Sequence, residues 1–240
     1  GIDPKYFLGQ QNRTYPMALN FGEGGSGLGY VKVLIEDYLV RAAKLKWVVY
    51  GISPRAFNRY YHSDEGDDIR KSSTYRLDKQ MQGWGTAGTI PIPASAVDTG
   101  DDDLSPWGFD GEDGMEDEIR SDRRRRDKQE DLQRGRYVLD QKRLEVFESL
   151  VELLGRRGVK MLGFTPPIHP LSIGQPCTDD DGTTRQGYDE FVAKMKALDA
   201  KYENFYFVDV NNKGEHEFEN DEFNNFDHLN KKGAKKLTLL

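Results

Sequence analysis

His228 is the residue in this sequence best suited to acid-base chemistry, and it lies in the segment NNFDHLNKKGA near the end of the chain. Its surroundings are polar, and Asp227 precedes it directly, which distinguishes it from a histidine packed in an apolar stripe. A histidine becomes a general base when one ring nitrogen reaches a nucleophile and the other bonds to a group that fixes its tautomer. Asn230 is a suitable cap for a short terminal helix. We therefore predict that His228 is a general base in a loop before that helix.

The other histidines and one serine give weaker signals. His169, in PPIHP, follows a predicted strand, and its proline neighbours suggest a rigid loop wall, whereas His62 and His216 look like exposed loop residues. Ser26, in FGEGGSG, has two interpretations that remain open. It is a nucleophile exposed by a glycine-rich turn, where a helix dipole would stabilise an oxyanion. Alternatively, it is a helix N-cap.

No cofactor or metal site is predicted. Residues 209–214 (DVNNKG) begin like a calcium loop, but a lysine replaces an oxygen ligand and position 220 lacks the bidentate Glu, so we interpret them as a turn. The acidic run 179–182 is expected to cap a turn. The glycine-rich stretch GEGGSGLG has neither the lysine of a P-loop nor the spacing of a dinucleotide-binding motif.

Apolar spacing predicts an alternation of strands and helices along the chain. Strands are expected at 17–21, 46–52, 159–164 and 205–210, and helices at 28–43, 138–154, 188–202 and from about 230. This alternation is typical of an α/β fold with a parallel sheet covered by helices on both faces. Ligands bind such sheets at the carboxyl ends of the strands, and the NNFDH segment follows the last of those ends.

Charge and composition limit the partners. The net charge of −7 argues against a nucleic-acid backbone as the main partner, and no apolar run approaches the roughly 20 residues that span a bilayer. Residues 62–136 contain many charged residues and few apolar side chains that could pack in a core. This composition predicts an insertion within a single domain covering 1–240. We interpret this insertion as a solvated excursion, with a lid or partner surface as the functional alternative. The single cysteine leaves the compartment open.

The motifs together resemble the SGNH (GDSL-like) hydrolase superfamily, in particular its bacterial branch related to polysaccharide O-acetylation proteins. EFNNFDHLNKKGAKKLT is similar to the last block of that family, ALNFGEGGSGL to the second-strand block, WVVYGISPRAF to the third and VKMLGFTPPIHP to the fourth. The resemblance implies a three-layer flavodoxin-like sandwich around a parallel sheet (the SGNH hydrolase fold). It also implies a periplasmic or extracellular protein that acts on an acyl ester of a carbohydrate. His228 would be the base, and Gly24 or Gly25 with Ser53 would lie near the oxyanion hole.

Two departures from the family pattern bear on activity. Asn225 stands three residues before His228, where the family keeps an Asp, so Asn225 or Asp227 would orient the ring. The family's nucleophile serine follows its first strand, and this sequence begins at GIDPKYF, which matches the residues after that serine. We therefore expect the first strand and the nucleophile upstream of residue 1, with Ser26 as the alternative nucleophile. A catalytically degenerate module that binds a glycan or assembles with a membrane acyltransferase is the competing hypothesis. A third is a domain that shares only the fold.

Overall fold

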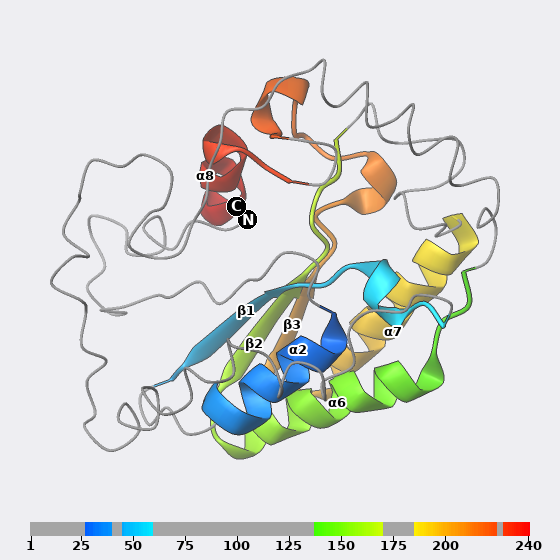
Figure 1. Cartoon of the computed structure of the whole chain (residues 1–240), viewed down its shortest axis with the longest axis vertical. Helices are drawn as coiled ribbons and strands as arrows, with labels where there is room; N and C mark the ends of the chain where they lie inside the picture. Colours follow the sequence, from blue (N-terminus) through cyan, green and yellow to red (C-terminus); the bar gives the residue numbers. More distant parts are fainter. Residues whose placement is uncertain (1–26, 40–44, 60–136, 170–184, 225–227) are drawn as a thin grey trace, which may run out of the picture.

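The computed structural model describes residues 27–39, 45–59, 137–169, 185–224 and 228–240 (Figure 1). The expected strand at 17–21 and the charged insertion at 62–136 lie outside these ranges. Within them the helices and strands follow one another in the order α2 (Leu28–Val33), β1 (Trp47–Gly51), α6 (Gln141–Arg156), β2 (Lys160–Phe164), α7 (Arg185–Lys201), β3 (Phe205–Val208) and α8 (Lys231–Leu239).

The three strands form one parallel sheet in the order β1-β2-β3, which is also their order in the sequence. Met161 on the central strand β2 pairs with Val48 on one side and with Phe205 on the other. Since α6 joins β1 to β2 and α7 joins β2 to β3, each neighbouring pair of strands is connected through a helix. These observations confirm an α/β fold with a parallel sheet.

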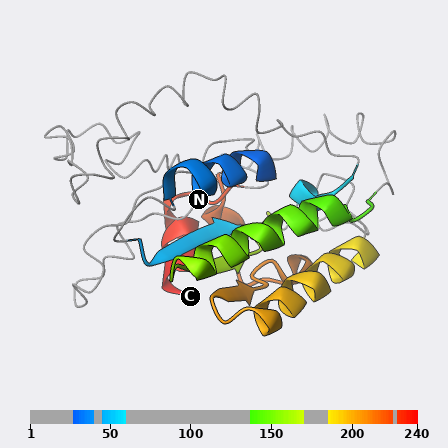
Figure 2. The same cartoon turned by 90° about the horizontal axis from the view of Figure 1, so that it is seen from below.

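One face of the sheet packs against α2, α6 and α7, which run alongside one another with α6 between the other two (Figure 2). Phe147 of α6 lies at the centre of this layer. Its ring centroid is 5.6 Å from that of Phe57 and 5.5 Å from that of Phe205, both in edge-on geometry. Such aromatic contacts add to the stabilisation that comes from burying the rings. The main core therefore joins all three strands to three helices.

The opposite face of the sheet is more open among the described residues. Val49 and Tyr206 are each 37 % exposed and Val208 is 49 % exposed. Near the amino ends of the strands, the Trp47 and Tyr206 rings lie 5.5 Å apart, and the Lys160 ammonium lies over both. The expected helical cover is thus confirmed for one face in the part of the chain that the structure describes.

Element boundaries differ from the predicted ones where local polar groups end or begin a helix. α6 starts at Gln141 rather than at Val138, because the Asp140 carboxylate accepts a hydrogen bond from the Lys142 amide at 2.9 Å. The preceding Leu139 forms an isolated antiparallel bridge with Asn58. The first predicted helix continues beyond α2 as a wider π-helical turn, Leu34–Tyr38. β3 ends at Val208, two residues before the predicted end.

Candidate functional site at the carboxyl edge of the sheet

The carboxyl ends of β2 and β3 are joined by a polar group of side chains, here called the edge node: Thr165, Tyr188, Asp209 and Asn211. The Thr165 hydroxyl donates to Oδ1 of Asp209 at 2.7 Å, and the Tyr188 hydroxyl donates to the same oxygen. The backbone N–H of Asn211 donates to Oγ1 of Thr165 at 3.1 Å. The node therefore connects two strands and α7 at the edge where ligands bind in sheets of this kind.

The protonation state of Tyr188 determines which group donates in its hydrogen bond to Asp209. The pKa of Tyr188 is raised well above its ordinary value, mainly by burial and to a smaller extent by the hydrogen bond to Asp209. The phenol is thus neutral at physiological pH and acts as a donor, with the Asp209 carboxyl as acceptor. Thr165, Asn211 and Tyr188 are nearly inaccessible to solvent, so this arrangement holds the strand ends together rather than presenting reactive groups.

The turn after β3 directs the chain back over β2. Asn212 and Lys213 both have positive φ, 43° and 59°, a conformation that non-glycine residues adopt at a cost. The Asn212 amide donates to Oδ1 of Asp209 at 3.0 Å, which ties this turn to the edge node. The predicted turn at 209–214 is observed and contains the short 3-10 helix Asn212–Gly214.

His216 lies in a loop, as predicted, but it is half-buried rather than exposed. The Phe218 amide donates to its Nδ1 at 3.2 Å, which makes Nδ1 the acceptor and leaves the proton on Nε2. Nε2 can then donate to the carbonyl oxygen of Ile168, 2.6 Å away. Through this ring the segment after β3 is bonded to the segment after β2.

A small apolar cluster lies next to His216 and is formed by Phe218, Phe223 and Leu229. Phe223 contacts two histidine rings, that of His169 at 5.1 Å and that of His216 at 5.9 Å between centroids. His169 is fully buried, so its ring is part of this packing.

The same cluster supports the loop that carries His228. Phe223 and Leu229 form an antiparallel bridge, and the Asn224 amide donates to the His228 carbonyl oxygen at 2.8 Å. Asn230 caps α8 as predicted, because its Oδ1 accepts from the amides of Lys232 at 2.9 Å and Gly233 at 3.1 Å. The side chain of His228 is exposed. His228 is thus held by its backbone while its imidazole remains accessible.

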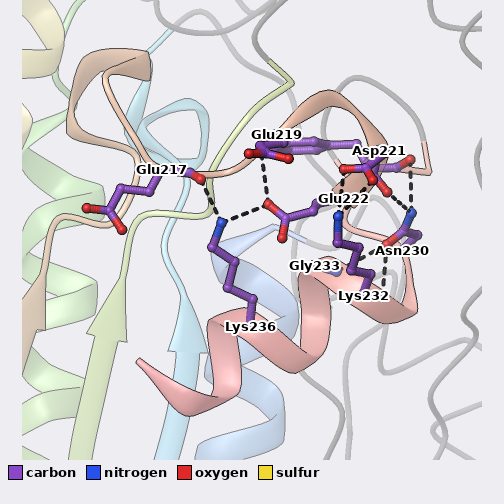
Figure 3. Close-up of polar contacts among 9 residues, drawn as sticks. Glu217, Glu219, Asp221, Glu222, Asn230, Lys232, Gly233 and Lys236 are labelled. Atoms are coloured by element: carbon purple, nitrogen blue, oxygen red, sulfur yellow. Dashed lines mark hydrogen bonds and ion pairs between the residues drawn. The ribbon is translucent and has the colours of Figure 1, made fainter.

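Helix α8 is fastened to the short 3-10 turn Asn220–Glu222 by two ion pairs (Figure 3). Lys236 pairs with Glu222 at 2.9 Å, and Lys232 pairs with Asp221 at 2.7 Å. The backbones approach closely at Gly233, where an added Cβ would lie 2.1 Å from the Glu222 carbonyl oxygen. Residues 216–224 and 228–240 are called the C-terminal unit below; Figure 1 shows its helix α8, in red, beyond the carboxyl ends of the strands.

Of the predicted site residues, the structure describes Ser53, His169 and His228. Ser53 follows β1 and caps the 3-10 turn Pro54–Phe57, accepting from the Arg55 amide at 3.3 Å. His169 reaches the loop of His228 through Phe223. The remaining predicted residues lie outside the described ranges: Gly24, Gly25, Ser26, Asn225 and Asp227.

The described residues hold no group of three or more His, Cys, Asp or Glu side chains arranged to bind a metal ion. None of the helices described is both long enough and apolar enough to cross a bilayer. Comparisons with protein-family models, with curated proteins and with solved structures give no match to this chain. The site must therefore be interpreted from its own residues.

Proposed function

We propose that this chain is an SGNH-type hydrolase domain with a flavodoxin-like fold, an esterase or O-acyltransferase that acts on acyl esters of carbohydrate. The observation that carries the proposal is the setting of His228. Its imidazole is exposed in a loop whose backbone is fixed by the Phe223–Leu229 bridge, by the Asn224 amide and by the Asn230 cap. A base must be accessible to substrate and also held in place, and this loop meets both requirements.

In the proposed reaction, His228 removes the proton from a serine hydroxyl as the serine oxygen attacks the ester carbonyl carbon. His228 then returns the proton to the carbohydrate oxygen as the bond between that oxygen and the acyl carbon breaks. Water, or a second hydroxyl in the transferase case, takes the acyl group from the serine. The serine is either Ser26 or one that precedes residue 1. Asp227 or Asn225 orients the imidazole, and Gly24, Gly25 and Ser53 line the oxyanion region, with His169 in the wall behind the substrate.

A catalytically degenerate module is the second candidate, and Asn225 favours it. A neutral amide in the place of the family's carboxylate can hold an imidazole but cannot stabilise an imidazolium by charge, which costs about 10⁴-fold in kcat in a serine triad. In this case the same edge of the sheet binds a glycan, or the domain assembles with a membrane acyltransferase. A periplasmic or extracellular location belongs to both proposals.

Release of acetate from p-nitrophenyl acetate and from an acetylated oligosaccharide tests the enzyme hypothesis. In the full native polypeptide, His228→Ala should lower kcat/KM by roughly 10³-fold or more, whereas Asp221→Asn, an exposed change in the same unit, should leave it unchanged. Equal rates for wild type and His228→Ala would remove His228 from the mechanism.

Two further variants test which residue is the nucleophile and which residue orients the imidazole. Ser26→Ala abolishes activity if Ser26 is the nucleophile and has little effect if an upstream serine is. Asn225→Asp should raise kcat if Asn225 occupies the orienting position, because a carboxylate there would stabilise the imidazolium.

A further inference from the structure

Glu222 connects three parts of the C-terminal unit although it lies outside the loop that carries His228. Its carboxylate is buried, with 4 % of the residue exposed, and Oε2 accepts from the Glu219 amide at 2.8 Å and from Lys236 Nζ at 2.9 Å. Its backbone carbonyl accepts from the Asn230 amide at 3.1 Å. One residue therefore bonds to its own turn, to α8 and to the end of the His228 loop.

Lys236 is the cation that matches this buried carboxylate. Its ammonium also donates to the Glu217 carbonyl oxygen at 2.6 Å (Figure 3). It lies 4.9 Å from the centre of the Phe218 ring. These contacts reach both ends of the segment from 217 to 222. A carboxylate, a carbonyl and an aromatic face together hold the ammonium in one position, whereas the ammonium of a surface lysine moves freely in water.

We propose that Glu222 and Lys236 are positioning residues for His228. The ion pair fixes α8 against the turn Asn220–Glu222, and the loop of His228 joins these two elements. Asn230 begins α8 while bonding to Glu222, and the Asn224 amide closes the loop on the His228 carbonyl. A shift of α8 relative to the turn would therefore move His228. The inference rests on the proposed function for its catalytic meaning, and its structural content can be tested without that function.

The second ion pair between the same two elements provides a matched control. Asp221 and Lys232 are 67 % and 54 % exposed in their side chains, whereas those of Glu222 and Lys236 are 6 % and 31 % exposed. Exposed pairs are screened by water and contribute little, while removing one partner of a buried pair leaves a desolvated charge. Both pairs join a carboxylate of the turn to a lysine of α8, but the Glu222–Lys236 pair is more buried and also bonds to the Glu219 amide and the Glu217 carbonyl oxygen.

Hydrogen exchange at the Asn224 amide and the ¹⁵N and ¹³C signals of the His228 ring provide the test, measured by NMR on the full polypeptide. We expect Glu222→Gln and Lys236→Met to accelerate Asn224 exchange roughly 10- to 100-fold and to shift the His228 signals. Asp221→Asn should change exchange less than about 3-fold. Lys236→Arg keeps the charge and should stay close to wild type, and the double variant Glu222→Gln/Lys236→Met should recover part of the loss.

Glu222→Gln behaving like Asp221→Asn would overturn the proposal, and so would equal effects of Lys236→Arg and Lys236→Met. The Lys236 comparison decides the matter if Glu222→Gln does not fold.

Kinetics separate this inference from the proposed function. Where wild type hydrolyses the ester, Glu222→Gln should lower kcat at least about 10-fold with little change in KM, because it displaces the base rather than the substrate. A wild type without esterase activity would overturn the proposed function, and the NMR comparison would then judge the positioning role by itself.

Discussion

The main core and the C-terminal unit are stabilised by different kinds of interaction. Among the described residues, twenty buried residues form the main core; they come from β2, β3, α2, α6, α7 and the segments next to the strands, and the half-buried Val48 and Tyr50 of β1 pack against them. The C-terminal unit has a cluster of three. In place of apolar area, the C-terminal unit uses the Asn230 cap, the Glu222–Lys236 pair and the His216 hydrogen bonds. The first region should therefore respond mainly to changes of volume and the second to changes of charge and close contact.

The largest expected effect is that of Phe147→Ala in the main core. Removing a fully buried ring leaves a cavity between α6 and the sheet and should lower the free energy of unfolding by about 3–5 kcal/mol. Urea unfolding followed by circular dichroism measures the loss. Phe147→Leu fills part of the space and should cost less than half as much. A loss below about 1 kcal/mol for the alanine variant would mean that the ring does not anchor the layer.

Gly233→Ala should have the next largest effect, and it acts in the C-terminal unit. The new methyl would lie 2.1 Å from the Glu222 carbonyl oxygen, so α8 must move away from the turn. Alanine favours a helix by about 1 kcal/mol over glycine, yet we expect a net loss of about 2 kcal/mol because a backbone atom stands in the way. Lys235→Ala, on the exposed side of α8, is the control and should stay within about 0.5 kcal/mol of wild type. A stabilised Gly233→Ala protein would show that the close approach does not constrain α8.

Tyr188→Phe in the edge node should cost about 1 kcal/mol at neutral pH. It removes one hydrogen bond, but Oδ1 of Asp209 keeps the Thr165 hydroxyl and the Asn212 amide as donors, so no buried acceptor is left unsatisfied. Chemical denaturation at pH 7 gives the value. A loss near that of Phe147→Ala would contradict this assignment of a local role.

The same variant should also change the alkaline limb of stability. Because the pKa of Tyr188 is raised in the folded state, the phenol ionises first in the unfolded chain. The contribution of the protonated phenol to the free energy of unfolding is complete below about pH 10. Above that pH it is lost by about 1.4 kcal/mol per pH unit. Between pH 9 and 11.5 the free energy of unfolding should therefore fall less steeply with pH in Tyr188→Phe than in wild type. Tyr206→Phe, on the open face, is the matched control, and identical limbs for Tyr188→Phe and wild type would contradict the prediction.

The smallest effect is expected for Asp221→Asn. Its ion pair with Lys232 is exposed, so the loss of unfolding free energy should be at most about 0.5 kcal/mol and should disappear in 1 M salt. Denaturation at low and high salt measures it. A loss of several kcal/mol would mean that burial does not distinguish the two ion pairs of the C-terminal unit.

Local patterns predicted the elements of this fold more reliably than the contacts between them. The apolar spacing of α6 and the Asn230 cap were recognisable because helical periodicity and capping depend on neighbouring residues. His216 was misjudged because its partner Ile168 lies 48 residues away, and the edge node was missed because Thr165 and Asp209 are 44 residues apart. Such pairings are created by the parallel sheet. The only sequence signal for the edge node was the presence of Asp209 and Asn211 just after β3, and a turn explained these residues equally well.

The arrangement of α8 also determines how the protein should respond to mechanical force. A pull on Leu240 reaches α8 first, and among the described residues α8 is attached to the remainder of the C-terminal unit by its two ion pairs, by hydrogen bonds of Asn230 and Lys236 and by a few apolar side chains. The sheet behind it is joined through two parallel strand ladders and the main core. Extension should therefore proceed in two steps, in which α8 detaches at low force and displaces the His228 loop before any strand separates.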